Sequence, residues 1–263
     1  MTQVARAALA LGAPRRPGYH AAMRWLLVYL AVAGCARAGK ENSIIGGLTD
    51  ARPRSGDSGI VPEPDASPID APTAQVAMNQ TASGAIDTDN LYGCFDPSTG
   101  FSRETSYYRV FTLADYAVAS TLRVTEVDFA IADATGAGGQ QPGKVNLYSY
   151  GGPIDGTTLD LSQVRMVSSV DIQIADGTGT RMAVPITGDV APSTNLLVEI
   201  MTPDGLGDGN DFSLGTNTAG ERHPGYVRSP SCGSIADPTA MSSLGFGEVD
   251  ALISAIGITG APD

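Results

Sequence analysis

Residues 194–217 read TNLLVEIMTPDGLGDGNDFSLGTN and carry the clearest signal for the fold class. Side chains alternate over 196–201 with the period of two that is typical of a strand buried on at least one face. A proline and two Asp-Gly pairs then interrupt the alternation, because proline cannot donate to a central ladder and glycine adopts the positive φ of a tight turn. Alternation resumes at Phe212 and Leu214. The stretch therefore predicts a strand, an acidic glycine-rich loop and a second strand.

The loop inside this stretch is the strongest candidate site in the sequence. Asp204, Asp208, Asn210 and Asp211 are hard oxygen donors on a flexible segment, which is what calcium coordination requires. Their spacing differs from that of an EF-hand. Aspartate, asparagine and glycine also dominate ordinary turns, so the alternative is turn chemistry without a metal. Calcium is the only cofactor that the sequence suggests.

The same alternation recurs on both sides of the loop. A bulge near Thr125 and Glu126 would bring the two halves of one strand into phase. The sequence Asp-Gly-Thr-Gly at 176–179 predicts a hairpin turn between two further strands. No stretch combines helical periodicity with sufficient length, so residues 86–263 predict an antiparallel β-sandwich, either Ig-like or jelly-roll. The predicted strands cover 106–112, 121–131, 145–150, 164–174, 182–186, 196–201, 212–214, 226–228 and 249–255.

Composition and charge agree with an exported β protein. Among 263 residues, 32 are glycine and 17 are proline, and both residue types interrupt helices. Residues 1–34 carry four arginines and no acid, so their removal lowers the basic count from 16 to 12 against 28 acids, a net charge of −16. An acidic surface repels phosphate backbones, which disfavours nucleic acid as a partner.

The N-terminal region predicts a secretory signal over residues 1–35. Arg24 precedes an apolar run at 25–34, which is much shorter than the roughly 20 residues of a membrane-spanning helix. The sequence Val-Ala-Gly-Cys at 32–35 resembles the lipobox of bacterial lipoproteins. In that family the cysteine, here Cys35, is acylated and becomes the new N-terminus, so the resemblance implies a lipid anchor in the membrane. An ordinary signal peptide is the alternative, and Met23 is an alternative start.

Residues 36–85 predict a disordered tether. Five prolines stand there among Asp, Ser, Gly and Ala, with few large apolar side chains to bury. Such a segment cannot offset the entropy lost on ordering and stays extended. A lipid anchor, a tether and a folded domain together predict an exported protein of the outer membrane or the cell surface.

Two cysteines remain once Cys35 is assigned to a lipid. Cys94 and Cys232 form an even pair in an oxidising compartment, which predicts a disulfide. A bridge that closes so long a loop would stabilise the fold by about 4–5 kcal/mol on the chain-entropy model. The alternative is two free thiols.

Catalytic motifs are sparse. His223 is the only histidine expected after export, whereas a histidine metal site usually needs two or three imidazoles. We expect it to be an exposed loop residue. Glu199 alternates within a strand and is the most plausible acid for a glycan or peptide hydrolase, although nothing in the sequence marks a second carboxylate for it. Six tyrosines indicate cross-strand packing rather than a ligand platform: Tyr92, Tyr107, Tyr108, Tyr148, Tyr150 and Tyr226.

The strands at 106–111, 145–148 and 198–200 make this region similar to the β-sandwich modules of exported bacterial proteins. Such modules serve as binding or spacing units on cell-surface proteins. The resemblance implies a non-catalytic binding or adhesion module for an extracellular protein or glycan. A carboxylate-based extracellular hydrolase and a structural component of the envelope are the alternatives. The binding loops would be 203–211 and 220–228, because a sandwich presents its connections at its two ends.

Overall fold

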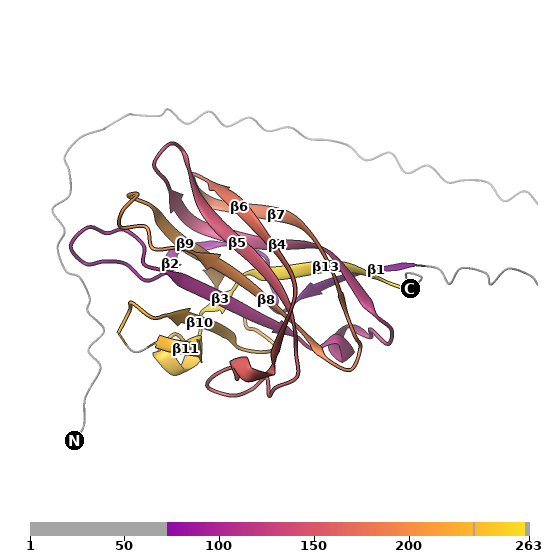
Figure 1. Cartoon of the computed structure of the whole chain (residues 1–263). Helices are drawn as coiled ribbons and strands as arrows, with labels where there is room; N and C mark the ends of the chain where they lie inside the picture. The colour runs from indigo at the N-terminus through magenta and orange to yellow at the C-terminus, as the bar shows by residue number, and fades with distance from the viewer. Residues whose placement is uncertain (1–72, 234, 261–263) are drawn as a thin grey trace, which may run out of the picture. The chain divides into compact units, whose positions relative to one another are not determined.

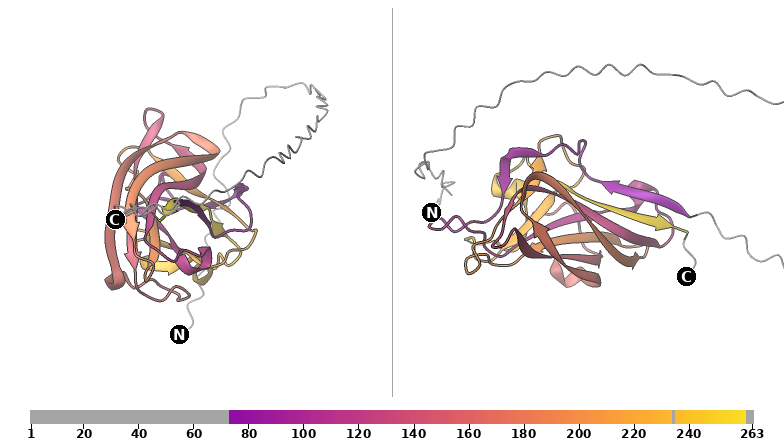
Figure 2. Two further views of the ribbon diagram at one scale, coloured as in Figure 1. Left: turned by 90° about the vertical axis from the view of Figure 1, so that its right-hand side faces the viewer. Right: turned by 90° about the horizontal axis from the view of Figure 1, so that it is seen from above.

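The computed structural model describes residues 73–260 apart from residue 234, and the described residues form an antiparallel β-sandwich of two sheets (Figure 1). The predicted all-β sandwich is therefore confirmed. The views in Figure 2 show the two sheets as layers whose connections gather at the ends. Within these residues only three short 3-10 helices occur, η1 (Leu113–Tyr116), η2 (Leu161–Gln163) and η3 (Met241–Leu244). None of the described helices has the length and apolar character that crossing a membrane requires.

One sheet has seven strands in the order β1-β13-β4-β9-β12, with β7 also paired to β4 and β2 to β9. Its strands are β1 (Ala74–Asn79), β2 (Asp87–Tyr92), β4 (Leu122–Thr135), β7 (Gly177–Val190), β9 (Asp211–Asn217), β12 (Asp250–Ala251) and β13 (Ile253–Thr259). The bulge predicted near Thr125 exists, since the register of β4 against β7 shifts between Val124 and Glu126.

The other sheet has six strands in the order β11-β10-β3-β8-β5-β6, and Figure 1 looks onto it. Its strands are β3 (Thr105–Phe111), β5 (Gln140–Tyr150), β6 (Val164–Ala175), β8 (Asn195–Thr202), β10 (Gly225–Ser229) and β11 (Ile235–Ala240). The strand predicted at 196–201 is β8, which lies between β3 and β5 in the middle of this sheet.

The core lies between the sheets, where alternate residues of each strand point inward. Val198 and Ile200 of β8 meet Phe129 and Ile131 of β4 in one buried cluster. A smaller apolar cluster lies on the outer face of the six-stranded sheet, where the connection from β5 to β6 covers it; its buried members include Tyr108, Leu197 and Leu159. The fold therefore has one main core and one covered patch outside it.

The predicted start of the sandwich at residue 86 is wrong. Residues 74–79 form β1, which pairs along its whole length with β13 at the edge of the seven-stranded sheet. Only Met78 of this strand is fully buried. The strand has few large apolar side chains, so its sequence resembles that of a tether. Its order comes from the backbone hydrogen bonds that β13 supplies. Residues 36–72 of the predicted tether lie outside the described residues.

The hairpin predicted around 176–179 is also wrong. The turn joins β6 of the six-stranded sheet to β7 of the seven-stranded sheet, so it carries the chain from one layer to the other. Instead, β6 pairs with β5 and β7 pairs with β4. Alternation shows which face of a strand is buried, but it does not show which strand lies beside it.

Candidate functional site

Loop 203–211 joins β8 to β9 at one end of the sandwich and has a defined shape. The Gly205 N–H donates to the Ser102 carbonyl at 2.8 Å, and the Ser102 N–H donates to the Asn210 carbonyl at 3.0 Å. A Cβ at Gly205 would lie 2.5 Å from the Asn210 carbonyl oxygen, so only glycine fits there. The loop is therefore built into the fold through the segment before β3.

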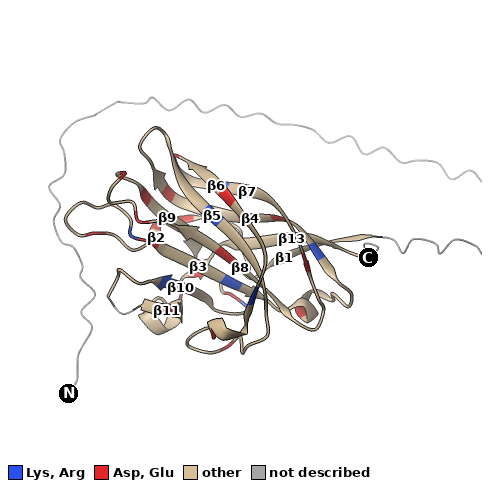
Figure 3. Cartoon of the chain, viewed as in Figure 1, with Lys and Arg blue, Asp and Glu red and all other residues tan. Residues whose placement is uncertain are grey.

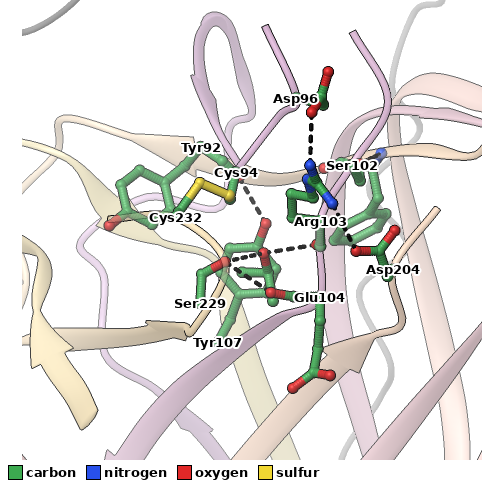
Figure 4. The surroundings of a disulfide bond; sticks show 12 residues. Tyr92, Cys94, Asp96, Ser102, Arg103, Glu104, Tyr107, Asp204, Ser229 and Cys232 are labelled. Atoms are coloured by element: carbon green, nitrogen blue, oxygen red, sulfur yellow. Dashed lines mark hydrogen bonds and ion pairs between the residues drawn. A yellow bond between two sulfur atoms is a disulfide. The ribbon is translucent and has the colours of Figure 1, made fainter. Parts of the chain in front are cut away.

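The four predicted calcium ligands do not converge. Arg103 lies between Asp96 and Asp204 (Figure 4), at 3.3 Å from the Asp204 carboxylate. Asp211 accepts a hydrogen bond from the Ser102 hydroxyl at 3.3 Å, and burial raises the pKa of its carboxyl group. Across the described part of the chain, no group of three or more His, Cys, Asp or Glu side chains could hold a metal ion. Asp204 is engaged by Arg103 and by the Leu206 N–H, and Asp211 by the Ser102 hydroxyl.

Asp208 and Asn210 instead line a polar hollow of about 250 Å³. The turn between β4 and β5 contributes Ala137, β5 contributes Gln140 and Pro142, and β6 contributes Gln173. Figure 1 places this turn and loop 203–211 at the end of the sandwich away from β1. We call this space the amide hollow, because three of its six lining residues carry carboxamides.

Asn210 marks the floor of the amide hollow. The residue is only 4% exposed, and its Oδ1 accepts a hydrogen bond from the Ala137 N–H at 3.3 Å. Its Nδ2 has no hydrogen-bond partner among the described residues, yet it is not among their fully buried unpaired atoms. A buried amide that keeps an unpaired, solvent-reachable donor is unusual, because most buried polar groups find a partner. This donor is thus not fully buried, and Asn210 is one of the residues that line the hollow.

The other polar side chains of the amide hollow also lack hydrogen-bond partners among the described residues. In residues 73–260, no hydrogen bond or ion pair is formed by the side chains of Gln140, Gln173 or Asp208. No lysine or arginine lines the hollow. Figure 3 shows acidic and basic positions on the strands of the sandwich. The hollow thus offers amide donors and acceptors and one carboxylate.

A second, acidic hollow lies beside the other predicted binding loop, 220–228. Its volume is about 520 Å³, and its lining includes Glu221, Glu248 and Asp250. A neighbouring hollow of about 350 Å³ shares Gly220 and Glu221 with it. The sequence predicted this loop as a binding loop, but it indicated no role for these three acids.

A buried ion pair underlies the acidic hollow. Arg109 of β3 is completely buried, and its Nη1 lies 2.5 Å from the Glu221 carboxylate and 2.8 Å from the His223 carbonyl. Its Nη2 donates to the Ala251 carbonyl. Burial raises the pKa of the Glu221 carboxyl group, although Arg109 acts in the opposite direction. The alternation of β3 places position 109 on the inner face with Tyr107, but no sequence signal indicated its acidic partner.

Glu199 does not line either hollow. It lies on the outer face of the six-stranded sheet, 6% exposed, and its Oε2 accepts hydrogen bonds from Asn146 Nδ2 at 2.7 Å and the Tyr148 hydroxyl at 2.6 Å. A catalytic carboxylate needs a second acid and an open approach. The hydrogen-bonded surroundings of Glu199 instead suit a positioned acceptor in a polar network.

The tyrosines follow the packing prediction with one exception. Tyr148 is half-buried and reaches the surface. The remaining five are buried, namely Tyr92, Tyr107, Tyr108, Tyr150 and Tyr226.

His223 lies in a loop as predicted, but the prediction that it is exposed is wrong. Its side chain is 16% exposed, and its ring lies between two aspartates of other segments. Nε2 lies 2.9 Å from Asp115 of η1, and Nδ1 lies 3.1 Å from Asp155 of the β5–β6 connection. These two carboxylates hold the ring against the body of the sandwich.

The predicted disulfide between Cys94 and Cys232 is confirmed, with a Cα–Cα distance of 6.0 Å. It links the segment after β2 to the loop between β10 and β11, beside Tyr92 and Ser229 (Figure 4). Both cysteines also line a small apolar hollow of about 130 Å³. Cys35, the predicted lipidation site, lies outside the described residues.

No protein-family model and no curated protein matches this sequence. Among solved structures, the chain is similar to the cysteine protease and lectin-like domains of a surface layer associated protein of Clostridium difficile. The identity is 13% and the TM-score 0.41, over 59% of this chain and 32% of that chain. A clostridial cysteine protease after propeptide cleavage gives 13% identity and a TM-score of 0.39, over 59% and 36% of the two chains. The matched part of this chain thus spans about a third of those structures, and at these TM-scores the likeness carries no argument about function.

Proposed function

We propose that this chain is an exported lipoprotein whose β-sandwich binds an extracellular ligand in the amide hollow. Export and membrane anchoring rest on the apolar run at 25–34 and on Cys35, which follows it in a sequence resembling a lipobox. A Cys94–Cys232 disulfide agrees with an oxidising compartment outside the cytoplasm. The tether predicted before the sandwich would hold the hollow away from the membrane surface.

The observation that carries the proposal is the unpaired polar lining of the amide hollow. Asn210 is nearly buried and still has an open donor, and Asp208 and Gln173 have open groups beside it. A concave site with a few convergent polar groups is the usual form of a ligand-binding site. Its side chains come from a loop, a turn and two strands, so the fold itself assembles it.

Binding without turnover fits the chemistry of this hollow best. Its lining contains one carboxylate, Asp208, whereas general acid–base cleavage of a glycan uses a pair of carboxylates. The hollow contains no histidine, cysteine or serine that would act as a nucleophile or base. Carboxamides orient and hold a ligand without transferring protons.

The test is a binding screen with the full chain in detergent against immobilised glycans and extracellular proteins. We expect at least one ligand to be retained by the wild type and lost by the double variant Asp208→Ala, Gln173→Ala. Gln75→Ala is a matched control, because Gln75 is an exposed strand glutamine outside the hollow. The melting temperatures of all variants should agree, because the changed side chains have no partners among the described residues.

Two results would contradict the proposal. One is a retained ligand that binds the double variant as tightly as the wild type. The other is release of a cleaved product from that ligand, which would make the protein an enzyme.

A hydrolase built on the acidic hollow is the second candidate. The observation that favours it is the raised pKa of Glu221 beside Asp250, since two acids with different surroundings are what glycoside hydrolysis requires. This pair replaces Glu199 as the acid to test. Asp250 is 3% exposed and accepts a hydrogen bond from the Gly220 N–H at 2.7 Å, so the variant must first be shown to fold. Cleavage of a glycan that Asp250→Asn abolishes in protein that still unfolds cooperatively would favour the hydrolase over the binding module.

A further inference from the structure

The outer face of β5 runs from the amide hollow to Tyr148. On β5 the outward side chains are Gln140, Pro142, Lys144, Asn146 and Tyr148, because inward and outward residues alternate along a strand. Gln140 and Pro142 line the hollow, and Tyr148 lies six residues beyond Pro142 along the strand. At about 3.3 Å per residue, this stretch is roughly 20 Å long.

The neighbouring strands complete this face. Asn146 stands opposite Glu199 of β8 and Ser169 of β6, and Tyr148 stands opposite Met166. Met166 is 58% exposed, which is high for a large apolar side chain. Tyr148 also stands opposite Leu197 of β8, which belongs to the apolar cluster that the β5–β6 connection covers. A strip over β8, β5 and β6 therefore begins at the hollow, with Asn146 and Glu199 buried in its middle and Met166 exposed at its far end.

The polar groups in the middle of the strip are held in fixed positions. The Ser169 hydroxyl donates to Asn146 Oδ1 at 2.6 Å, and Asn146 Nδ2 donates to Glu199 at 2.7 Å. The Tyr148 hydroxyl donates to the same Glu199 oxygen at 2.6 Å. Burial raises the pKa of the Tyr148 hydroxyl, so it stays a neutral donor. This network fixes the Tyr148 ring at the far end of the strip.

We infer that a neutral glycan chain lies along this strip, with one end in the amide hollow and another part against Tyr148. The inference rests on the proposed binding function and names its ligand class. Sugar hydroxyls donate and accept at once, and the carboxamides of Asn210, Gln140 and Gln173 offer both kinds of group. The apolar faces of sugar rings suit the Tyr148 ring and the Met166 side chain.

Charge and geometry separate this ligand from the alternatives. Lys144 forms an ion pair with Asp171 at 3.1 Å, so the lysine of the strip is already matched by a carboxylate and does not favour an anionic polymer. An extended peptide is captured mainly by backbone groups at the edge of a sheet. Here the unpaired polar groups are side chains of the hollow, and two of them, Gln140 and Gln173, stand on the face of the sheet.

The test measures the affinity of the full chain in detergent for neutral glycans of increasing length. The probes are disaccharides and hexasaccharides of glucose, mannose, xylose and N-acetylglucosamine. For one series we expect the hexasaccharide to bind more tightly than the disaccharide. Tyr148→Ala should weaken hexasaccharide binding about tenfold, as loss of a stacking ring does, and leave the disaccharide unchanged. Tyr148→Phe keeps the ring and should retain most of the affinity, and Gln173→Ala should weaken both lengths.

Each failure has its own meaning. Equal affinity for both lengths, unchanged in Tyr148→Ala, would overturn the strip. If no neutral glycan binds but an extracellular protein is retained and the double variant Asp208→Ala, Gln173→Ala loses it, the glycan is wrong and the proposed function stands. If no ligand of any class responds to these hollow variants, the proposed function itself fails.

Discussion

At the scale of single residues, the least expected feature is the completely buried Arg109. Strand alternation places it on the inner face of β3, where an arginine is tolerated only if its charge is matched. Glu221 supplies that match from a loop 112 residues away. A single sequence carries no signal for a pair so far apart, so sequence reasoning predicted neither partner.

The ion pair makes a stability prediction. Glu221→Gln leaves the Arg109 charge buried without a carboxylate, which should lower the free energy of unfolding by about 3–5 kcal/mol. Urea unfolding at neutral pH measures the change. Glu248→Gln is the control, because Glu248 is exposed in the same hollow and should change stability by less than about 0.5 kcal/mol. Equal effects of the two variants would mean that Arg109 is stabilised without Glu221.

Asp96 makes a pH prediction. Hydrogen bonds from the Ser98 hydroxyl and N–H, with smaller help from Arg103 and Thr99, lower its pKa to about 2. Since the folded-state pKa lies below that of the unfolded chain, the stabilisation is fully present above pH of about 4 and is lost as pH falls toward 2. Asp96→Asn should flatten the stability profile in that window. Parallel unfolding profiles of the two proteins between pH 2 and 5 would contradict the assignment.

At the scale of elements, the disulfide joins two loops that no strand pairing connects. Cys94 and Cys232 are 138 residues apart, and closing such a loop reduces the entropy of the unfolded chain by an amount worth about 5 kcal/mol on the chain-entropy model. The double variant Cys94→Ala, Cys232→Ala should therefore unfold at lower denaturant concentration, with a loss of about 2–5 kcal/mol. Alkylation of both cysteines in freshly exported, non-reduced protein would show that the bridge does not form.

The positions of the strands could be predicted from the sequence more readily than the pairing of the strands in the sheets. The alternation of residues 194–217 gave β8, the loop and β9 correctly, because burial of one face leaves a period of two. The turn at 176–179 was placed correctly but assigned to a hairpin, since a tight turn and a crossing between layers use the same Asp-Gly chemistry. Strand β1 was missed because backbone pairing, rather than apolar side chains, orders it.

The candidate site was predicted only in part. Loop 203–211 was chosen for its carboxylates, and two of its four named residues, Asp208 and Asn210, do line the amide hollow. Gln140 and Gln173 could not be found, because they come from strands that only the folded sheet brings to the loop. The chemistry also differs from the prediction, since carboxamides rather than converging carboxylates dominate the lining.

At the scale of the whole molecule, the proposal combines a lipid anchor, a tether and a binding sandwich. Replacing Cys35 with serine should release the protein from the membrane fraction, since a serine hydroxyl does not replace the thiol that is acylated in lipoproteins. Fractionation and the mass of the N-terminal peptide measure this directly. If the wild-type protein is exported and its N-terminus carries no acyl mass, the protein is an ordinary secreted protein and the lipid anchor is wrong.

A nuclear magnetic resonance titration with the ligand that the screen retains would locate its binding site on the protein. We predict that the side-chain amide signals of Asn210, Gln140 and Gln173 shift on binding, because these side chains line the amide hollow. Signals of Gly220 and Gly247 beside the acidic hollow should stay in place. Shifts confined to the acidic hollow, with the Asn210 side chain unmoved, would contradict the account.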